Sequence, residues 1–282
     1  MQQGFLVSRA RRIVLVAAAG LTALVAGCTS TGADGQYEPV RAQHGKDVMW
    51  IPTPDTLVAK MLEMAQVTSN DLLYDLGAGD GKIPIEAARR YGATAVGIEY
   101  NPEMAQFARE NVKKAGVQEK VTIITGDIFE ENFSRADVLT LYLLESINVK
   151  LKPRILKMKP GTRVVSNSFR MGAWQPDQAV TVDNGWSAYL WVVPSQIQGV
   201  WKVSGAGMPV GELDLKQIFQ HFEGSLRSDT GAVIPVHGRV DGTRIYLESS
   251  DTGKTIVRQS IVIKDNQWID PMTGAVMAQR VH

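Results

Sequence analysis

The chain of 282 residues has few of the side chains that build disulfides or metal centres. Its one cysteine, Cys28, has no partner within the chain, so an internal disulfide is excluded. Only four histidines are present, and His221 and His237 lack the spacing of metal ligands. We therefore expect no metal site and assign both histidines to structural or surface positions.

The sequence also lacks an excess of charge of either sign. It holds 30 basic and 29 acidic residues, and removal of residues 1–27, with their three arginines, would leave 27 against 29. A nearly neutral chain gives no electrostatic basis for binding nucleic acid, so no such partner is expected. The hydrophobic content of 44% and the charged content of 21% are typical of a folded globular protein.

No apolar run is long enough to span a bilayer comfortably. The longest, Ile13–Ala26, falls short of the roughly 20 residues that a helical span requires. Because Arg9, Arg11 and Arg12 precede it, with no acidic residue before Asp34, residues 1–27 read as an export signal.

The end of this segment, Leu24-Val-Ala-Gly-Cys28, resembles the lipobox of bacterial lipoproteins. The resemblance implies cleavage before Cys28, lipid on its sulfur, and a place in the bacterial cell envelope. Thr29 stands where an aspartate would favour the inner membrane, which implies the periplasmic face of the outer membrane. An ordinary signal or short anchor is the alternative. Arg11-Arg12 loosely resembles a twin-arginine signal, so the general secretory and twin-arginine routes both stay open.

A strand, a glycine turn and a helix are predicted around Asp75-Leu-Gly77-Ala-Gly79-Asp80-Gly81. Further strands end at Glu99 and Asp127, and helices are predicted between the strands. The alternation predicts an α/β fold with a doubly wound, mostly parallel sheet. Ligands of such sheets bind at the carboxyl ends of the strands, where Asp75, Glu99 and Asp127 would gather.

The turn distinguishes between two nucleotide cofactors. A dinucleotide fingerprint would place its third glycine at position 82, which is Lys82, so the spacing suits S-adenosylmethionine better than NAD. With Glu99 and Asp127, the pattern resembles the class I, Rossmann-like methyltransferases with seven β-strands. That resemblance implies S-adenosylmethionine as cofactor, Glu99 on the ribose hydroxyls and Asp127 near the adenine. The cofactor-binding residues expected are Thr53, Asp75, Gly77, Gly79, Gly81, Glu99 and Asp127.

Thr53 enters this set because the segment before the first motif often covers the cofactor in related methyltransferases. The alternative is that Pro52 and Pro54 only shape a turn. Asp55 is expected to cap the helix that starts at Thr56.

The methyl acceptor is less well defined. Residues 75–102 resemble the lysine methyltransferases of mitochondria, and residues 48–205 resemble bacterial methyltransferase-domain proteins of unassigned substrate. The Asn/Asp-Pro-Pro-aromatic motif of enzymes that methylate amide or base nitrogens is replaced by Tyr142-Leu-Leu-Glu145. Tyr142 and Glu145 are therefore the candidate catalytic residues, lining the acceptor site and orienting an amine. The alternative is that Tyr142 packs beside the cofactor and Glu145 caps a helix. Asn167 is a further acceptor-side candidate.

Four segments are predicted. Residues 1–27 form the signal peptide that ends before Cys28, and residues 28–47 form a flexible tether. Residues 48–197 form the methyltransferase-like domain, in which Pro153 is expected to end or bend a helix. Residues 198–282 form a small antiparallel β-domain of short alternating strands, one of them at Glu212–Gln220.

Two functions follow. The first is a methyltransferase that acts on a protein lysine or a small molecule. The second is an exported lipoprotein that uses the fold as a non-catalytic binding or scaffolding module.

Overall fold

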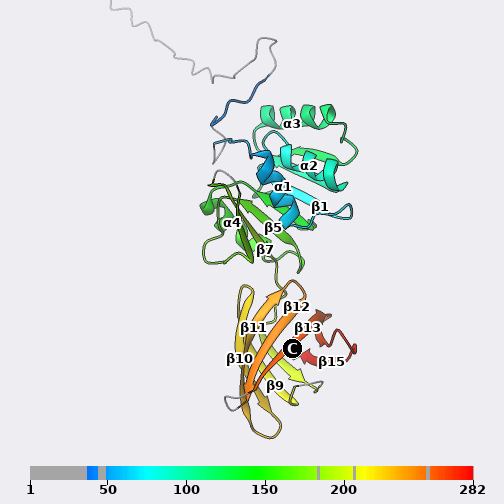
Figure 1. Ribbon diagram of the computed structural model, residues 1–282, viewed down its shortest axis with the longest axis vertical. Coiled ribbons are helices and arrows are strands. Elements are labelled where there is room, and N and C mark those ends of the chain that lie inside the picture. The colour runs from blue at the N-terminus through cyan, green and yellow to red at the C-terminus, as the bar shows by residue number, and fades with distance from the viewer. Residues whose placement is uncertain (1–36, 44–48, 183–184, 206–207, 252–254, 282) are drawn as a thin grey trace, which may run out of the picture.

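The structure is a computed structural model, and it describes residues 37–43, 49–182, 185–205, 208–251 and 255–281. The predicted signal peptide, Cys28 and most of the predicted tether therefore lie outside the described residues. Two bodies follow one another along the chain, a sheet covered by helices and then a barrel (Figure 1). No helix in these ranges is both long and apolar enough to cross a membrane.

The first body is a seven-stranded sheet in the order β3-β2-β1-β4-β5-β7-β6. Neighbours among β1 to β5 run parallel, whereas β7 runs antiparallel to β5 and to β6. The strands are β1 (Leu72–Leu76), β2 (Thr94–Glu99), β3 (Val121–Thr125), β4 (Val138–Leu141), β5 (Arg163–Asn167), β6 (Gln178–Thr181) and β7 (Ser187–Val192). The predicted fold class, a doubly wound and mostly parallel sheet, is confirmed.

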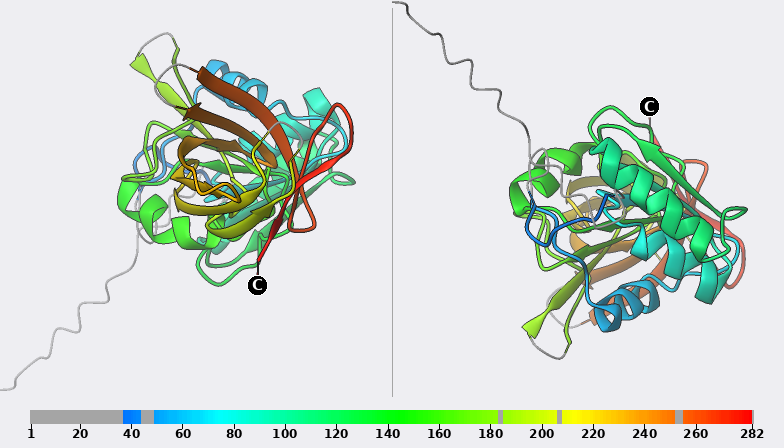
Figure 2. Two further views of the ribbon diagram at one scale, coloured as in Figure 1. Left: turned by 90° about the horizontal axis from the view of Figure 1, so that it is seen from below. Right: turned by 90° about the horizontal axis from the view of Figure 1, so that it is seen from above.

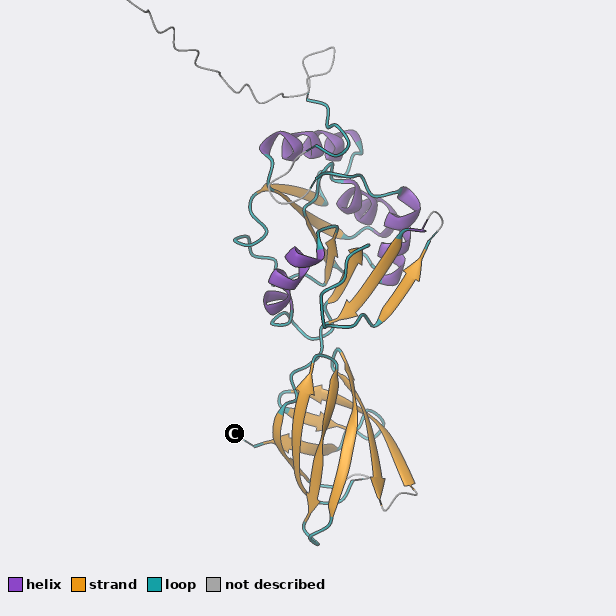
Figure 3. Ribbon diagram, turned by 90° about the vertical axis from the view of Figure 1, so that its left-hand side faces the viewer, coloured by secondary structure: helices purple, strands orange, loops and turns teal. Residues whose placement is uncertain are grey.

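Helices cover both faces of this sheet because each buries one apolar face against it. They are α1 (Asp55–Met64), α2 (Lys82–Tyr91), α3 (Pro102–Lys114) and α4 (Glu145–Ile155). The first three share one buried cluster with Leu73, Val138 and Val165 of the sheet. Helix α4 shares a second cluster with Leu76 and Leu141. Figure 3 shows the helices and the strands of this sheet together, above the barrel.

Two helix boundaries differ from those expected. Helix α1 begins at Asp55, and Pro54 is its N-cap, so Asp55 does not cap the helix through its side chain. The Asp55 carboxylate instead pairs with Lys82 at 2.9 Å. Helix α4 continues through Pro153 to Ile155, since a proline in the last turn removes only one hydrogen bond.

The second body is a closed antiparallel barrel, which confirms the predicted β-domain. Its order is β10-β11-β12-β13-β14-β15-β8-β9. The strands are β8 (Gly199–Val203), β9 (Gly211–Ile218), β10 (His221–Ser228), β11 (Val233–Asp241), β12 (Arg244–Asp251), β13 (Thr255–Lys264), β14 (Gln267–Ile269) and β15 (Val276–Arg280). Buried and exposed side chains alternate along β9, and the buried set fills the interior. Figure 2 shows the barrel along the long axis of the molecule.

A hairpin of the barrel contacts the sheet domain. The strand expected at Glu212–Gln220 ends at Ile218, because Phe219 and Gln220 form the turn into β10. Phe219 has φ of +54° and stacks on Trp174, with ring centroids 6.0 Å apart. Beside it, Arg239 of β11 pairs with Asp177 at 2.7 Å.

Candidate active site

The glycine turn after β1 lets backbone come close to a ligand. Gly77, Gly79 and Gly81 have φ of +82°, +54° and +80°, which side chains other than glycine rarely adopt. A Cβ atom on Gly79 would stand 2.5 Å from Nε1 of Trp50, so the indole packs directly against the backbone of the turn.

Glu99, at the carboxyl end of β2, is fixed from two sides. Its Oε2 accepts the Gly79 N–H at 2.9 Å, and its Oε1 accepts the Asn101 N–H at 2.9 Å. Burial raises the pKa of Glu99, although these backbone donors act to lower it. Each carboxylate oxygen has further acceptor capacity, which suits the vicinal hydroxyls of a ribose.

Asp75 is the most deeply buried acid of the site, with 2% of its surface exposed. The Thr140 hydroxyl donates to its Oδ1 at 2.7 Å. Burial raises the pKa of Asp75 to about 7, and the nearby charges of Asp80 and Glu99 add to that rise. The group therefore titrates near neutral pH, and a cation bound beside it would favour the ionised form.

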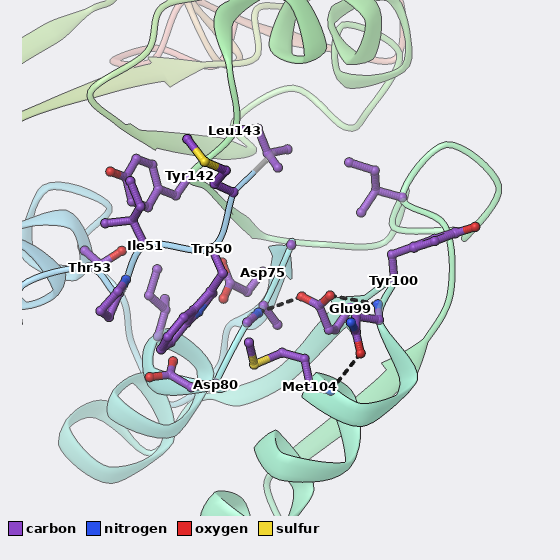
Figure 4. A pocket seen from close by; sticks show the side chains of 18 of the residues that line it. Trp50, Ile51, Thr53, Asp75, Asp80, Glu99, Tyr100, Met104, Tyr142 and Leu143 are labelled. Carbon is purple, nitrogen blue, oxygen red and sulfur yellow. Dashed lines mark hydrogen bonds between the residues drawn. The ribbon is translucent and has the colours of Figure 1, made fainter. Parts of the chain in front are cut away.

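A cavity of about 360 Å³ opens over the turn, a size that suits a nucleoside cofactor (Figure 4). Most of the predicted residues line it, and its lining contains one lysine, Lys82, against four acids. The predicted residues in the wall are Thr53, Asp75, Gly77, Gly79, Glu99, Asp127 and Tyr142, and the fourth acid is Asp80.

Two predicted residues stand elsewhere. Gly81 is the N-cap of α2 and packs against Ala108, so its role is to start the helix. Glu145 lies at the first position of α4, and its carboxylate accepts the Gly172 N–H at 3.2 Å, outside the cavity lining. Asn167, the further candidate, is buried and donates to Thr53 Oγ1 at 3.4 Å.

Thr53 and Asp127 line the cavity from segments far apart in the chain. The backbone carbonyl of Thr53 accepts the Lys82 ammonium at 3.0 Å, which ties the segment before α1 to the glycine turn. Oδ1 of Asp127 accepts the Phe129 N–H at 2.9 Å, so the loop after β3 is held by the carboxylate itself.

Several wall residues were not predicted from the sequence, above all Trp50, Ile51 and Met104. Trp50 precedes the predicted lid residue Thr53 by three positions, and an isolated aromatic at the start of the folded region was the available signal. Met104 lies on the first turn of α3, where helical periodicity alone predicts a core position.

The two histidines in the described part of the chain lie on the surface of the barrel. His221 and His237 are both exposed, and His237 faces Glu248 at 3.5 Å. No group of three potential metal ligands occurs among the described residues.

The comparisons with known proteins concern this part of the chain. The model of the ANTKMT methyltransferase domain matches residues 75–178. A protein-lysine N-methyltransferase of Saccharolobus islandicus is 42% identical over 52% of this chain and 94% of its own. An adenine nucleotide translocase lysine N-methyltransferase of Mus musculus is 29% identical over 49% of this chain and 59% of its own. The chain thus spans less than two thirds of that mammalian relative.

A solved structure matches over the same region. An RNA methyltransferase from Salinibacter ruber, in complex with S-adenosyl-L-homocysteine, is 49% identical, with a TM-score of 0.51. The match covers 52% of this chain and 96% of that one. The structural match agrees with the glycine turn, with the carboxylates at the strand ends and with the relative matched along 94% of its length. These observations show that the chain belongs to the class I S-adenosylmethionine-dependent methyltransferases.

Proposed function

We propose that this methyltransferase transfers the methyl group of S-adenosylmethionine to the side-chain amine of a protein lysine. The observation that carries the proposal is the charge of the cavity wall, whose lining contains four carboxylates and a single lysine. That lysine, Lys82, is already engaged by Asp55 and by the Thr53 carbonyl. Such a wall attracts cations and repels phosphate, which favours an amine over an RNA backbone.

The residues present fit the cofactor. Gly77 and Gly79 leave room for close approach, Glu99 offers its carboxylate to the ribose, and Asp75 and Asp127 add negative charge beside a cationic ligand. When bound, the cofactor supplies the methyl group and the thioether leaving group. The chain has to hold the amine in line, and an amine that binds as a cation must lose its proton before it attacks. Desolvation in the cavity lowers the pKa of an amine and favours that loss.

The names of the relatives also support lysine methylation. Two are named as lysine N-methyltransferases, and the catalytic function is thereby supported over the non-catalytic module. The Salinibacter ruber protein is named as an RNA methyltransferase, so the experiment has to distinguish a protein acceptor from an RNA acceptor.

The test is transfer of radiolabelled methyl groups from S-adenosylmethionine to a bacterial envelope extract, followed by digestion with protease or with ribonuclease. We expect label that protease releases as methyl-lysine. Glu99→Ala should remove it, with cofactor affinity at least tenfold weaker, about 1.4 kcal/mol. The exposed Glu119→Ala is the matched control and should methylate normally. Label that ribonuclease releases, or label on a small molecule, would contradict the lysine proposal.

We also propose that the protein is a lipoprotein of the bacterial cell envelope, anchored through Cys28 on the periplasmic face of the outer membrane. The lipobox-like sequence and the absence of any other cysteine support this. Cys28→Ala should abolish labelling with a palmitate analogue in cells. Labelling that persists in this variant would contradict the anchor.

A further inference from the structure

We propose that Tyr142, Phe169 and Trp186, here called the aromatic cluster, form the subsite that receives the acceptor's cationic side chain. This inference rests on the proposed function and names the residues that would select a charged amine over a neutral group of the same shape.

The topology of the sheet brings these residues to one place. Tyr142 directly follows β4, and Phe169 comes two residues after β5. Trp186 directly precedes β7, which runs antiparallel to β5 and therefore starts at the carboxyl end of β5. All three side chains thus lie at the sheet edge where this fold binds ligands.

The rings contact one another. The ring centroids of Tyr142 and Phe169 are 6.3 Å apart with planes inclined by 28°, and Trp186 meets Tyr142 edge-on at 6.0 Å. Each of the three side chains is only partly buried, and Tyr142 and Phe169 line the cavity itself. The cluster therefore presents aromatic surface both to the cavity and to solvent.

The residue before Phe169 has a strained backbone. The preceding residue, Ser168, has φ of +61°, an uncommon conformation for a residue with a side chain. The strain is held by hydrogen bonds from the Ser168 N–H to the Ser187 carbonyl and from the Phe169 N–H to the Asn167 carbonyl. Such strain persists where the surroundings fix it, and it is common at ligand sites.

Tyr142, the labelled member of the cluster, lies away from Glu99 in the cavity wall. In Figure 4, Tyr142 stands above Ile51 and Thr53 on the left, whereas Glu99, Tyr100 and Met104 lie to the right of Asp75. With the ribose at Glu99, the cavity wall that remains for the acceptor is the one that carries Tyr142.

The chemistry of the cluster suits a cation. Aromatic faces attract ammonium groups, and most strongly where water is excluded. Elsewhere in the described residues, cationic side chains already lie over rings, for example Arg170 over Tyr189 at 4.7 Å and Arg154 over Phe133 at 4.4 Å. Among the same residues, no lysine or arginine side chain is placed over a ring of the cluster. The exposed Arg41 acts on the Tyr142 hydroxyl through its charge only.

The test compares two probes on the protein saturated with S-adenosylhomocysteine. One is acetylated, amidated trimethyl-lysine, and the other is its neutral isostere with a tert-butyl group in place of the trimethylammonium. Calorimetry should show the cationic probe binding at least fivefold more tightly, because the two differ in charge and not in shape. Equal affinities, or no binding of the cationic probe, would overturn the proposal.

Variants assign the preference to these residues. Tyr142→Leu and Phe169→Leu should each remove most of the preference, whereas Tyr142→Phe should retain it because the ring remains. Tyr246→Leu, at an exposed tyrosine on the barrel, is the matched control. An unchanged far-ultraviolet circular dichroism spectrum should report intact folding in every variant, and adenosylhomocysteine is kept at a saturating concentration for each. A preference that survives both leucine variants would refute the assignment. If the parent protein methylates lysine but binds the two probes equally, only the subsite proposal is contradicted. If the parent protein methylates no lysine, the proposed function itself is contradicted.

Discussion

Replacing Asp75 with asparagine should stabilise the folded protein at alkaline pH while weakening cofactor binding. Burial raises the pKa of Asp75 from its ordinary value of 3.8 to about 7. The folded protein therefore keeps a proton that the unfolded chain releases between these two values. The stability contributed by this group is fully present below pH 3.8 and is lost as the pH rises to about 7.

The magnitude follows from the same two values. Each tenfold change in proton affinity corresponds to about 1.4 kcal/mol, so ionising Asp75 in the folded state costs up to about 4 kcal/mol above pH 7. Asparagine does not ionise, and its Oδ1 can still accept the Thr140 hydroxyl. Asp75→Asn should therefore raise the free energy of unfolding at pH 8, and the gain should be smaller by about 3 kcal/mol at pH 5.

The assay is urea unfolding at pH 5 and pH 8. Because the chain has two bodies, the transition to follow is the one that adenosylhomocysteine shifts. Calorimetry on the same variant should show cofactor affinity reduced at least tenfold, because a neutral amide does not attract a cationic ligand. A variant less stable than the parent at pH 8, or a difference independent of pH, would refute the reasoning.

Asp137→Asn is a control that should change the free energy of unfolding at pH 8 in the opposite direction. Burial acts to raise the pKa of Asp137, but hydrogen bonds from Lys159 and from the Leu72 N–H, together with the charges of Lys159 and Arg163, lower it overall. The Asp137 carboxylate therefore stabilises the fold above its ordinary pKa, and this contribution is lost as the pH falls below that value. The amide variant should be less stable than the parent at pH 8.

Three further predictions concern packing. Gly79→Ala should cost more than tenfold in cofactor affinity, because its Cβ would stand 2.5 Å from an indole nitrogen in the cavity wall; Gly116→Ala, with φ of +69° and no atom within 4 Å, should leave that affinity unchanged in the same titration. Arg163→Ala should lower the free energy of unfolding by about 3 kcal/mol in urea titration, because it removes the cationic partner of the largely buried Asp71 carboxylate. A loss below about 1 kcal/mol would show that the Arg163–Asp71 ion pair contributes little to stability. Phe219→Ala should remove about 3 kcal/mol at the contact between barrel and sheet and separate the two calorimetric transitions; a single unchanged transition would show that this contact does not couple them.

Residues close in sequence decided much of the site. The glycine turn needs only that Gly77 and Gly79 adopt positive φ, and the carboxylates of Glu99 and Asp127 follow from where apolar runs end. Those patterns are local, so the sequence by itself determined the doubly wound fold, the cofactor class and the edge of the sheet that binds it.

What the tertiary structure alone decided involves residues far apart in the chain. The indole of Trp50 reaches Gly79 only because the segment before α1 folds back over the turn. Glu145 turns to the Gly172 N–H because α4 packs beside that loop, which no local pattern encodes. The aromatic cluster forms through the antiparallel pairing of β7 with β5, and the barrel closes through the pairing of β8 with β15. Contacts of this kind depend on register and packing over long sequence separations, and periodicity along the chain does not determine either.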